Sequence, residues 1–139
     1  MQKDVHRVAL RVFWKPGEDI SSSYQKIMPF SSKELEQVIL TEEESEDLYQ
    51  RSVIIERKRL IASFMTNLFN VLDEEDKHTI VTEIDERIDN AHFELFLRLD
   101  KKTLRLISGG NCFHIKLTVA AYPKTKEAVK RKVLTWFAK

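Results

Sequence analysis

The sequence is poor in residues that make turns, since only three of its 139 residues are glycine and three are proline. Such a chain is expected to consist of long helices and strands joined by few tight loops. Its single cysteine excludes an intrachain disulfide, which favours a reducing compartment, the cytoplasm. No apolar run approaches the roughly 18 residues of a membrane-spanning helix. Arg7 and Arg11 interrupt the apolar N-terminal stretch, so it is not expected to be a secretory signal.

The sequence also lacks the short motifs that mark many enzymes. A P-loop, GxSxG, HExxH and a dinucleotide-binding glycine fingerprint are all missing. The three glycines leave little backbone with which to cradle a phosphate group. We therefore expect a protein without a cofactor, and binding is favoured over catalysis.

The composition is that of an ordinary folded chain. Hydrophobic residues make up 42% and charged residues 32%, which argues against a disordered tail or a collagen-like repeat. A length of 139 residues suits one domain, predicted to span residues 1–139.

The first predicted element is a strand over residues 5–14. Val8, Leu10 and Val12 alternate there with residues that point the other way. Alternation of period two is expected when one face of a strand is buried. A Pro-Gly pair ends the strand, and residues 17–30 form the longest predicted loop.

Helices are predicted in the middle of the chain. Two capping boxes, one at Ser31 and one at Thr41, have a hydroxyl residue followed three positions later by Glu, which is typical of helix starts. From Thr41 we expect a central helix to about Leu72, because apolar residues recur there every three or four positions. Asp73 is the expected cap of a further helix through Ala91.

After residue 92 the hydrophobic period changes from helical to alternating. Three strands are predicted over residues 93–99, 103–107 and 112–121, joined by a hairpin loop and a Ser-Gly-Gly-Asn turn. Pro123 is the expected start of a final helix. The fold class is therefore α+β, an antiparallel sheet of about four strands with helices packed on one face. The N-terminal strand is expected to pair with the C-terminal three-strand meander, because an isolated strand is not stable.

The formal net charge of +1 hides two opposed segments. Residues 31–99 carry 8 basic and 17 acidic side chains, a net charge of −9. Residues 100–139 carry 10 basic and 2 acidic side chains, a net charge of +8, and residues 1–30 add +2. This separation points to an anion-binding surface or to charge pairing within or between subunits.

The outward face of the predicted sheet is basic and carries aromatic rings. Only Glu94 is acidic there, beside His114 and Thr118. Cations between rings suit a phosphate backbone whose bases stack on the rings. The competing interpretation is an open sheet face that is polar merely because it meets water. The candidate nucleic-acid-binding residues on this face are Arg7, Arg11, Phe13, Phe96, Arg98, Arg105 and Lys116.

The last helix is the second basic feature, with Lys126 and Lys130 as candidate phosphate contacts. Runs of one charge are more often solvated faces. These lysines can also pair with the acidic segment of the same chain or favour the C-terminus of their own helix.

A weak candidate metal site lies in the second predicted helix. His78, Asp85, Asp89 and His92 share a narrow arc if that helix continues through residue 92. Seven residues of helix span about 10 Å, so one ion cannot bind all four. Asp85, Asp89 and His92 are the weak candidates that remain. A solvated helix face is favoured, and no metal is assigned.

Cys112 follows a glycine turn, where a thiol can be reactive. His114 is on the same face of the strand but about 7 Å away, too far to activate the thiol directly. We expect a structural or incidental cysteine.

The sequence therefore predicts a non-enzymatic binding module whose basic sheet face and C-terminal helix meet an anionic partner, with nucleic acid favoured. One alternative is an adaptor or inhibitor that binds a protein through the acidic residues 42–47, or a self-complementary homodimer. The other is a small metal-dependent hydrolase. The partner classes are thus nucleic acid, an acidic protein or a second copy, and no membrane.

Overall fold

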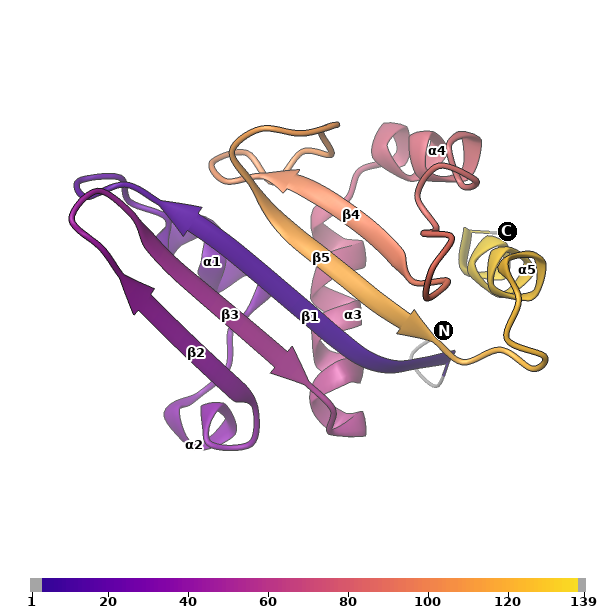
Figure 1. The fold of residues 1–139 in the computed structure, drawn as a ribbon, viewed down its shortest axis with the longest axis horizontal. Helices are drawn as coiled ribbons and strands as arrows, with labels where there is room; N and C mark the ends of the chain where they lie inside the picture. The colour runs from indigo at the N-terminus through magenta and orange to yellow at the C-terminus, as the bar shows by residue number, and fades with distance from the viewer. Residues whose placement is uncertain (1–3, 138–139) are drawn as a thin grey trace.

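Five strands form one antiparallel sheet in the computed structural model, which describes residues 4–137 (Figure 1). The predicted α+β class is confirmed, with five strands in place of about four. The elements in chain order are β1 (Val5–Trp14), α1 (Ser21–Ile27), α2 (Ser32–Leu35), β2 (Ile39–Glu44), β3 (Tyr49–Ile55), α3 (Lys58–Val71), α4 (Glu74–Thr82), β4 (Leu95–Asp100), β5 (Cys112–Val119) and α5 (Lys126–Phe137).

The N-terminal strand β1 lies at the centre of the sheet, whose order is β2-β3-β1-β5-β4. Val8 faces Ile55 of β3 on one side and Leu117 of β5 on the other. Val8, Leu10 and Val12 are buried, as their alternation predicts. The expected pairing of this strand with the C-terminal strands is confirmed, because leaving it unpaired would cost its backbone hydrogen bonds.

Residues 41–55 do not begin a helix, so the prediction from Thr41 is wrong. They form the β2–β3 hairpin, in which Thr41 faces Ser52. The residues Val53 and Ile55 alternate into the core and β3 pairs with the central strand, which outweighs the local preference of the glutamates for helix. The other capping box is confirmed, since the Ser31 hydroxyl accepts from the Glu34 N–H and the Glu34 carboxylate accepts from the Ser31 N–H.

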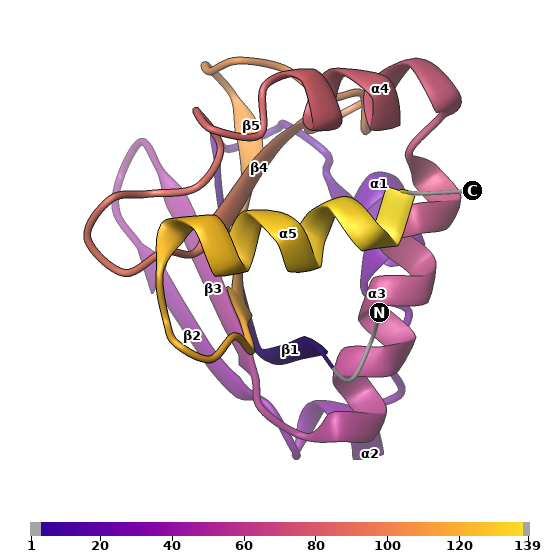
Figure 2. The same cartoon turned by 90° about the vertical axis from the view of Figure 1, so that its right-hand side faces the viewer.

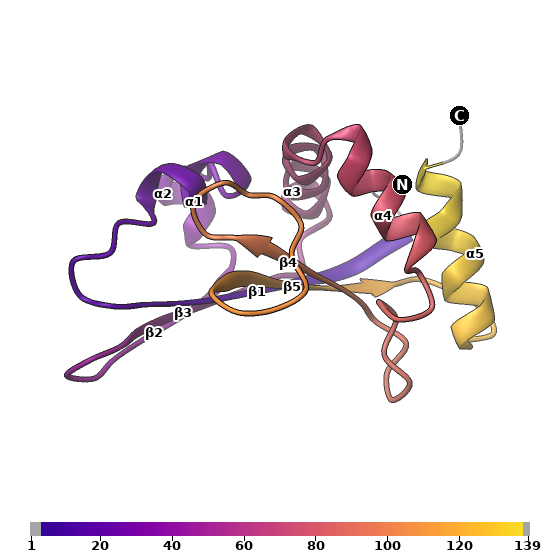
Figure 3. The same ribbon diagram turned by 90° about the horizontal axis from the view of Figure 1, so that it is seen from above.

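The helical layer covers one face of the sheet (Figure 3). The expected central core helix is present as α3, and Leu60, Phe64 and Leu68 are completely buried, but the helix begins at Lys58. The predicted loop over residues 17–30 contains the short helix α1, whose buried side chains fill the core beside α3.

The helix that begins after Asp73 is shorter than predicted. The Asp73 carboxylate caps α4 by accepting from the Asp76 N–H at 2.8 Å, as expected. However, α4 ends at Thr82, and residues 83–94 form turns that lead into β4. Within them the Asp89 N–H donates to the Glu94 carbonyl at 3.1 Å, a contact that a continuous helix cannot make.

The predicted strand over residues 103–107 is not formed as a sheet member. β4 pairs directly with β5, and only Leu106 makes an isolated bridge, to Leu99. Residues 101–111 are a long connection held by the Asp100 carboxylate, which accepts from the backbone N–H groups of residues 102 and 103. The predicted turn follows, with Gly110 at a φ of 86° that a side chain would disfavour.

The final helix α5 begins at Lys126 and not at Pro123. The Thr125 hydroxyl accepts from the Ala128 N–H at 3.2 Å and so supplies the cap. Buried Val129 and Val133 pack the helix beside the end of β5 and below α4 (Figure 2). Between residues 4 and 137, no helix is long and apolar enough to cross a membrane.

Candidate nucleic-acid interface

One face of the sheet is left open by the helices. α1, α2, α3 and α4 lie on the same side, and within the described residues no helix packs over the other side (Figure 3). We call this open side the outer face. By strand alternation and register it is formed by Arg7, Ala9, Arg11 and Phe13 of β1, Ile39, Thr41 and Glu43 of β2, Gln50, Ser52 and Ile54 of β3, Phe96 and Arg98 of β4, and His114, Lys116 and Thr118 of β5.

Three nitrogen-bearing side chains lie in one row across the outer face. Arg98 on β4 faces His114 on β5, and His114 also faces Arg11 on β1. Directly opposed side chains on an antiparallel sheet have Cβ atoms about 5 Å apart. The row therefore places one arginine on each side of His114, on the two neighbouring strands.

Each arginine of the row lies against an aromatic ring two positions away on its own strand. The Arg11 guanidinium carbon is 5.5 Å from the centre of the Phe13 ring, and that of Arg98 is 5.4 Å from the Phe96 ring. Cation–π contacts of this kind hold the guanidinium in place. The outer face thus presents two fixed pairs of a cation and a half-buried ring.

Two shallow depressions hollow the outer face beside this row. One holds about 240 Å³ and is lined by Arg11, Ile54 and Lys116 among others. The second holds about 200 Å³, and its lining includes Phe96, Arg98 and the acid Asp89. His114 and Lys116 line both, so the depressions lie on either side of β5. A ligand spanning them would lie along the row from Arg98 over His114 to Arg11.

The electrostatic surroundings of His114 favour its neutral form. Burial contributes most to lowering its pKa below the ordinary value of 6.5, and the charges of Arg98, Arg11 and Lys116 lower it further. At neutral pH the imidazole is therefore uncharged, with one nitrogen that donates and one that accepts. A phosphate bound to the row would offset these cations and raise the pKa of His114 again.

Arg7 and Lys116 are the two other predicted cations on the outer face. Both side chains are exposed to solvent. Arg7 lies beside Thr118, whose hydroxyl donates to the Glu94 carboxylate at 2.8 Å. Glu94, the acid predicted on this face, is therefore already hydrogen-bonded to Thr118.

Arg105 is a correction to the predicted outer-face set. Its segment is not a strand, and its guanidinium lies 2.8 Å from Asp73 and 3.2 Å from Asp76, with Glu75 at 3.8 Å. A hydrogen bond to Asp76 is the main cause of a raised pKa for Arg105. The arginine thus bridges the connection 101–111 to the start of α4 and is taken up by carboxylates.

The lysines of α5 are engaged with the turns that precede β4. Lys126 donates to the Asn90 side-chain oxygen at 3.0 Å, and Lys130 lies 3.1 Å from the Asp85 carboxylate. These contacts hold α5 against residues 83–94. They are an instance of the charge pairing within the chain that the opposed charges of the two segments predicted. Arg131 and Lys132 on the same helix are exposed.

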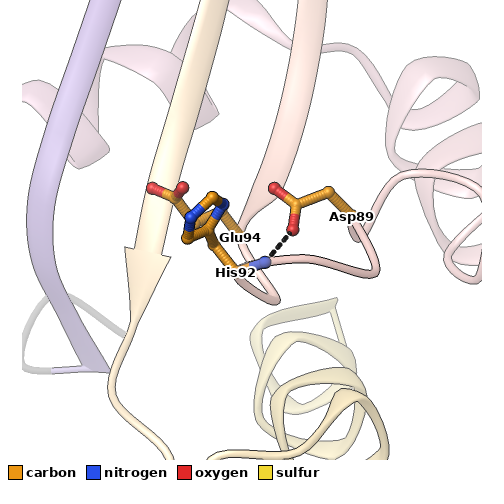
Figure 4. A group of neighbouring side chains, drawn as sticks. All are labelled: Asp89, His92 and Glu94. Carbon is orange, nitrogen blue, oxygen red and sulfur yellow. Dashed lines mark hydrogen bonds between the residues drawn. The ribbon is translucent and has the colours of Figure 1, made fainter.

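Asp89 and His92 do come together, but not on a helix. Figure 4 shows them with Glu94, and one ligand atom from each of the three lies within 4.8 Å of the others. Asp89 accepts from the His92 N–H at 2.6 Å and the Phe93 N–H at 2.8 Å, and such backbone bonds lower its pKa although burial raises it. The three could share a divalent cation.

The other two members of the predicted arc lie elsewhere. Asp85 pairs with Lys130 of α5, and His78 lies on α4, which ends before the cluster begins. The sequence prediction therefore missed Glu94 as a ligand candidate, because only the turn at residues 89–94 brings it back toward Asp89.

Cys112 is buried, with 3% of its surface exposed. Burial is the main cause of a raised pKa for its thiol, so the thiolate nucleophile is disfavoured at neutral pH. This environment agrees with the expectation of a structural cysteine.

The opposite end of the sheet is acidic. Five acids lie along or beyond β2, where every residue of the strand is exposed, and Glu42 pairs with Arg51 at 3.4 Å. By register, Glu42 and Glu44 lie on the helical side of the sheet, and Glu43 lies on the outer face. The cations of the outer face are on β4, β5 and β1, away from this acidic hairpin. The acids of this hairpin are Glu42, Glu43, Glu44, Glu46 and Asp47.

Ser52 and Ile54 belong to the outer face but were not predicted there. The glutamates before them and the apolar residues after them at helical spacing predict a helix instead. The alternation of Arg51, Val53 and Ile55 with these two residues was the signal for a strand.

Three known proteins resemble the chain along nearly its whole length. It is 25% identical over 146 residues to the RNA-binding protein PAB1135 of Pyrococcus abyssi, covering 94% of this chain and 92% of that protein. Protein AF2318 of Archaeglobus fulgidus has a similar structure, with a TM-score of 0.75, 21% identity and coverage of 96% and 99% of the two chains. The DUF54 protein Mth689 of Methanothermobacter thermautotrophicus gives a TM-score of 0.70 at 19% identity, with coverage of 96% and 98%.

A family model described as RNA binding matches residues 7–118. That range begins in β1 and ends in β5, so it contains the whole outer face and excludes α5. The match and the resemblance to PAB1135 support an RNA-binding module. With most of its length matched, the chain belongs to this RNA-binding family.

Proposed function

We propose that the protein binds RNA across the outer face of the sheet, over β4, β5 and β1. The main support for this proposal is the row Arg98–His114–Arg11, which crosses three adjacent strands on a face without helices. Phosphates lie against the arginines and Lys116 in this proposal, and His114 contributes a hydrogen bond.

The RNA in this proposal is single-stranded. Bases can stack on aromatic rings or guanidinium planes only where they are not paired in a helix. The pairs Arg11–Phe13 and Arg98–Phe96 offer such surfaces at two places on the face. The acidic β2–β3 hairpin repels the backbone, which confines the RNA to the basic half of the sheet.

The phosphate contacts are tested by the salt dependence of binding. Affinity for single strands falls with salt concentration with a slope of about 0.7 per phosphate neutralised, on logarithmic axes. Arg11→Gln and Arg98→Gln should each reduce that slope by about 0.7, since each removes one cation. Lys33→Gln is the matched control, because this exposed lysine lies on α2, on the helical side of the sheet.

The base contacts are tested with Phe96→Leu, which keeps apolar bulk but removes the ring. Loss of one stacked base should weaken binding of an oligouridylate about fivefold or more, with little change for an RNA duplex. Equal slopes for the arginine variants and the Lys33 control would refute the proposed face. Absence of any RNA retention at low salt would refute RNA binding itself.

A further inference from the structure

A second concave surface lies beyond the end of the outer face, between the β1–β5 ladder and α5. It is broad and open to solvent, with a volume of about 640 Å³. Ala120, Ala121 and Ala128 leave this space open. His6, Arg131 and Lys132 give it a basic lining, and no acidic residue is among those that line it. We call this surface the α5 cleft.

A fully exposed aromatic ring stands at the α5 cleft. Tyr122 lines it and has 99% of its surface exposed. Within residues 4–137, no hydrogen bond or ring contact involves its side chain. The fold leaves both faces of this ring free, so the ring is available to stack against a ligand.

The strand geometry directs a third group into the cleft. The β1–β5 register shifts between Val5, which faces Val119, and Arg7, which faces Thr118. His6 is the extra residue of this irregularity, and bulges of this kind re-aim side chains at the edges of ladders. The imidazole is thereby exposed at the cleft beside α5.

The two cations of α5 that line the cleft differ in whether they form an ion pair within the protein. Lys132 lies 3.4 Å from the Asp4 carboxylate, so part of its charge is already balanced. Arg131 is exposed, and within the described residues no ion pair or hydrogen bond of its side chain occurs. Arg131 is thus the cation with its five donors free for a phosphate.

We propose that the α5 cleft binds a further nucleotide of single-stranded RNA, with the base stacked on Tyr122 and the phosphate held by Arg131. This inference rests on the proposed function, because the same RNA leaves the outer face beside Arg7 and enters the cleft at the adjacent His6. The contact lies outside residues 7–118, so it extends the surface beyond the matched family region.

Photocrosslinking separates this inference from the function on which it rests. Oligouridylates of about 4 to 16 nucleotides, the range of single-stranded sites on one small domain, carry one 5-iodouridine at each position in turn. Crosslinked peptides are then identified by mass spectrometry. A crosslink to Tyr122 from one end of the longer oligomers is expected. Crosslinks to Phe13 or Phe96 without any to Tyr122 would overturn the inference and leave the outer face standing.

Variants give a second measurement. Tyr122→Leu and Arg131→Gln should each weaken binding of the longest oligomers about fivefold or more, and leave the shortest unchanged. Thermal unfolding should match the wild type, because both side chains are exposed. If oligoglutamate protects Arg131 from chemical modification and oligouridylate does not, the cleft binds an acidic protein and the inference is wrong. No RNA binding by any variant or by the wild type would instead refute the proposed function.

Discussion

Lys101 is a buried cation that the structure predicts to be essential for stability. It lies in the Asp-Lys-Lys segment after β4, and only 4% of its surface is exposed. Its ammonium group donates to the Phe13 carbonyl and lies within 2.9 Å of the Glu18 carboxylate. Its own carbonyl accepts from the Ser23 hydroxyl. One residue therefore ties the 101–111 connection to the end of β1 and to α1.

The perturbation is Lys101→Met, which keeps most of the aliphatic stem and removes the charge. It leaves the Phe13 carbonyl without its donor and the Glu18 carboxylate without its cation. An unpaired buried polar group costs about 1–3 kcal/mol, and a hydrogen bond to a charged group contributes about 1.5–3 kcal/mol. Glu18 is 23% exposed and keeps the Lys15 N–H, so water compensates part of the loss. We expect the free energy of unfolding to fall by about 2–4 kcal/mol.

Urea unfolding followed by far-ultraviolet circular dichroism measures this change. Lys102→Met is the matched control, because the neighbouring side chain is exposed and surface changes usually stay within about 0.5 kcal/mol. The melting temperature of the Lys101 variant should fall by roughly 10 °C, and that of the control should barely move. Equal unfolding free energies for the two variants would refute the structural role of Lys101.

The pH dependence gives an independent check of the same contact. The hydrogen bond from Lys101 is the main cause of a Glu18 pKa below its ordinary value of 4.5, and the Lys15 N–H adds to it. A carboxyl whose pKa is lowered by folding stabilises the protein above its unfolded pKa, and this stability is lost as the pH falls through the folded pKa. The difference between the wild type and Lys101→Met should therefore shrink below about pH 4. A difference independent of pH would argue against the Glu18 contact.

Three further predictions concern single side chains. Burial and neighbouring cations lower the pKa of His114, so the unfolded chain takes up a proton before the folded protein does as the pH falls below 6.5. The free energy of unfolding, measured with urea, should therefore decrease below pH 6.5. This decrease should be smaller in His114→Asn. The buried Cys112 thiol should react with a disulfide reagent only slowly until the protein is unfolded, so rapid reaction in native buffer would contradict its burial. Asp89→Ala removes the acceptor of the His92 and Phe93 N–H groups, whose hydrogen exchange should accelerate in NMR spectra, whereas Asp89→Asn should retain protection.

Prediction of β1 and β5 succeeded because apolar and polar residues alternate along them, which indicates directly which side chains are buried. Val8, Leu10 and Val12 are apolar at every second position, and only one face of a strand can take them into the core. The same reasoning placed Arg11 on the exposed face.

Prediction of residues 41–57 failed because the local preference conflicts with the tertiary pairing. Four glutamates follow the capping-box signal and favour a helix, yet β3 is held by its pairing with β1 and by the burial of Val53 and Ile55. The charged residues then lie on the exposed edge strand β2, where they cost little and discourage further strand pairing. Nothing local to Thr41 contains that information.

The predicted positions of the candidate residues were correct where they depended on alternation and wrong where they depended on topology. Arg7, Arg11, Phe96, Arg98 and Lys116 lie on the strands that the pattern indicated, and the structure brings them to one face. Arg105 was misplaced because its segment bridges to β4 through Leu106 alone, which left its guanidinium free to meet the acids of α4.

By itself the sequence determined which residues of β1, β4 and β5 face the core and which face water, because side-chain polarity at period two decides this locally. It also determined the opposed charges of the middle and the end of the chain. Only the tertiary structure decided which cations face which acids. Lys130 and Arg105 are neutralised by carboxylates from distant segments, whereas the arginines of the outer face are held over aromatic rings. The reason is physical, because ion pairing acts between neighbours in space, and strand order sets those neighbours.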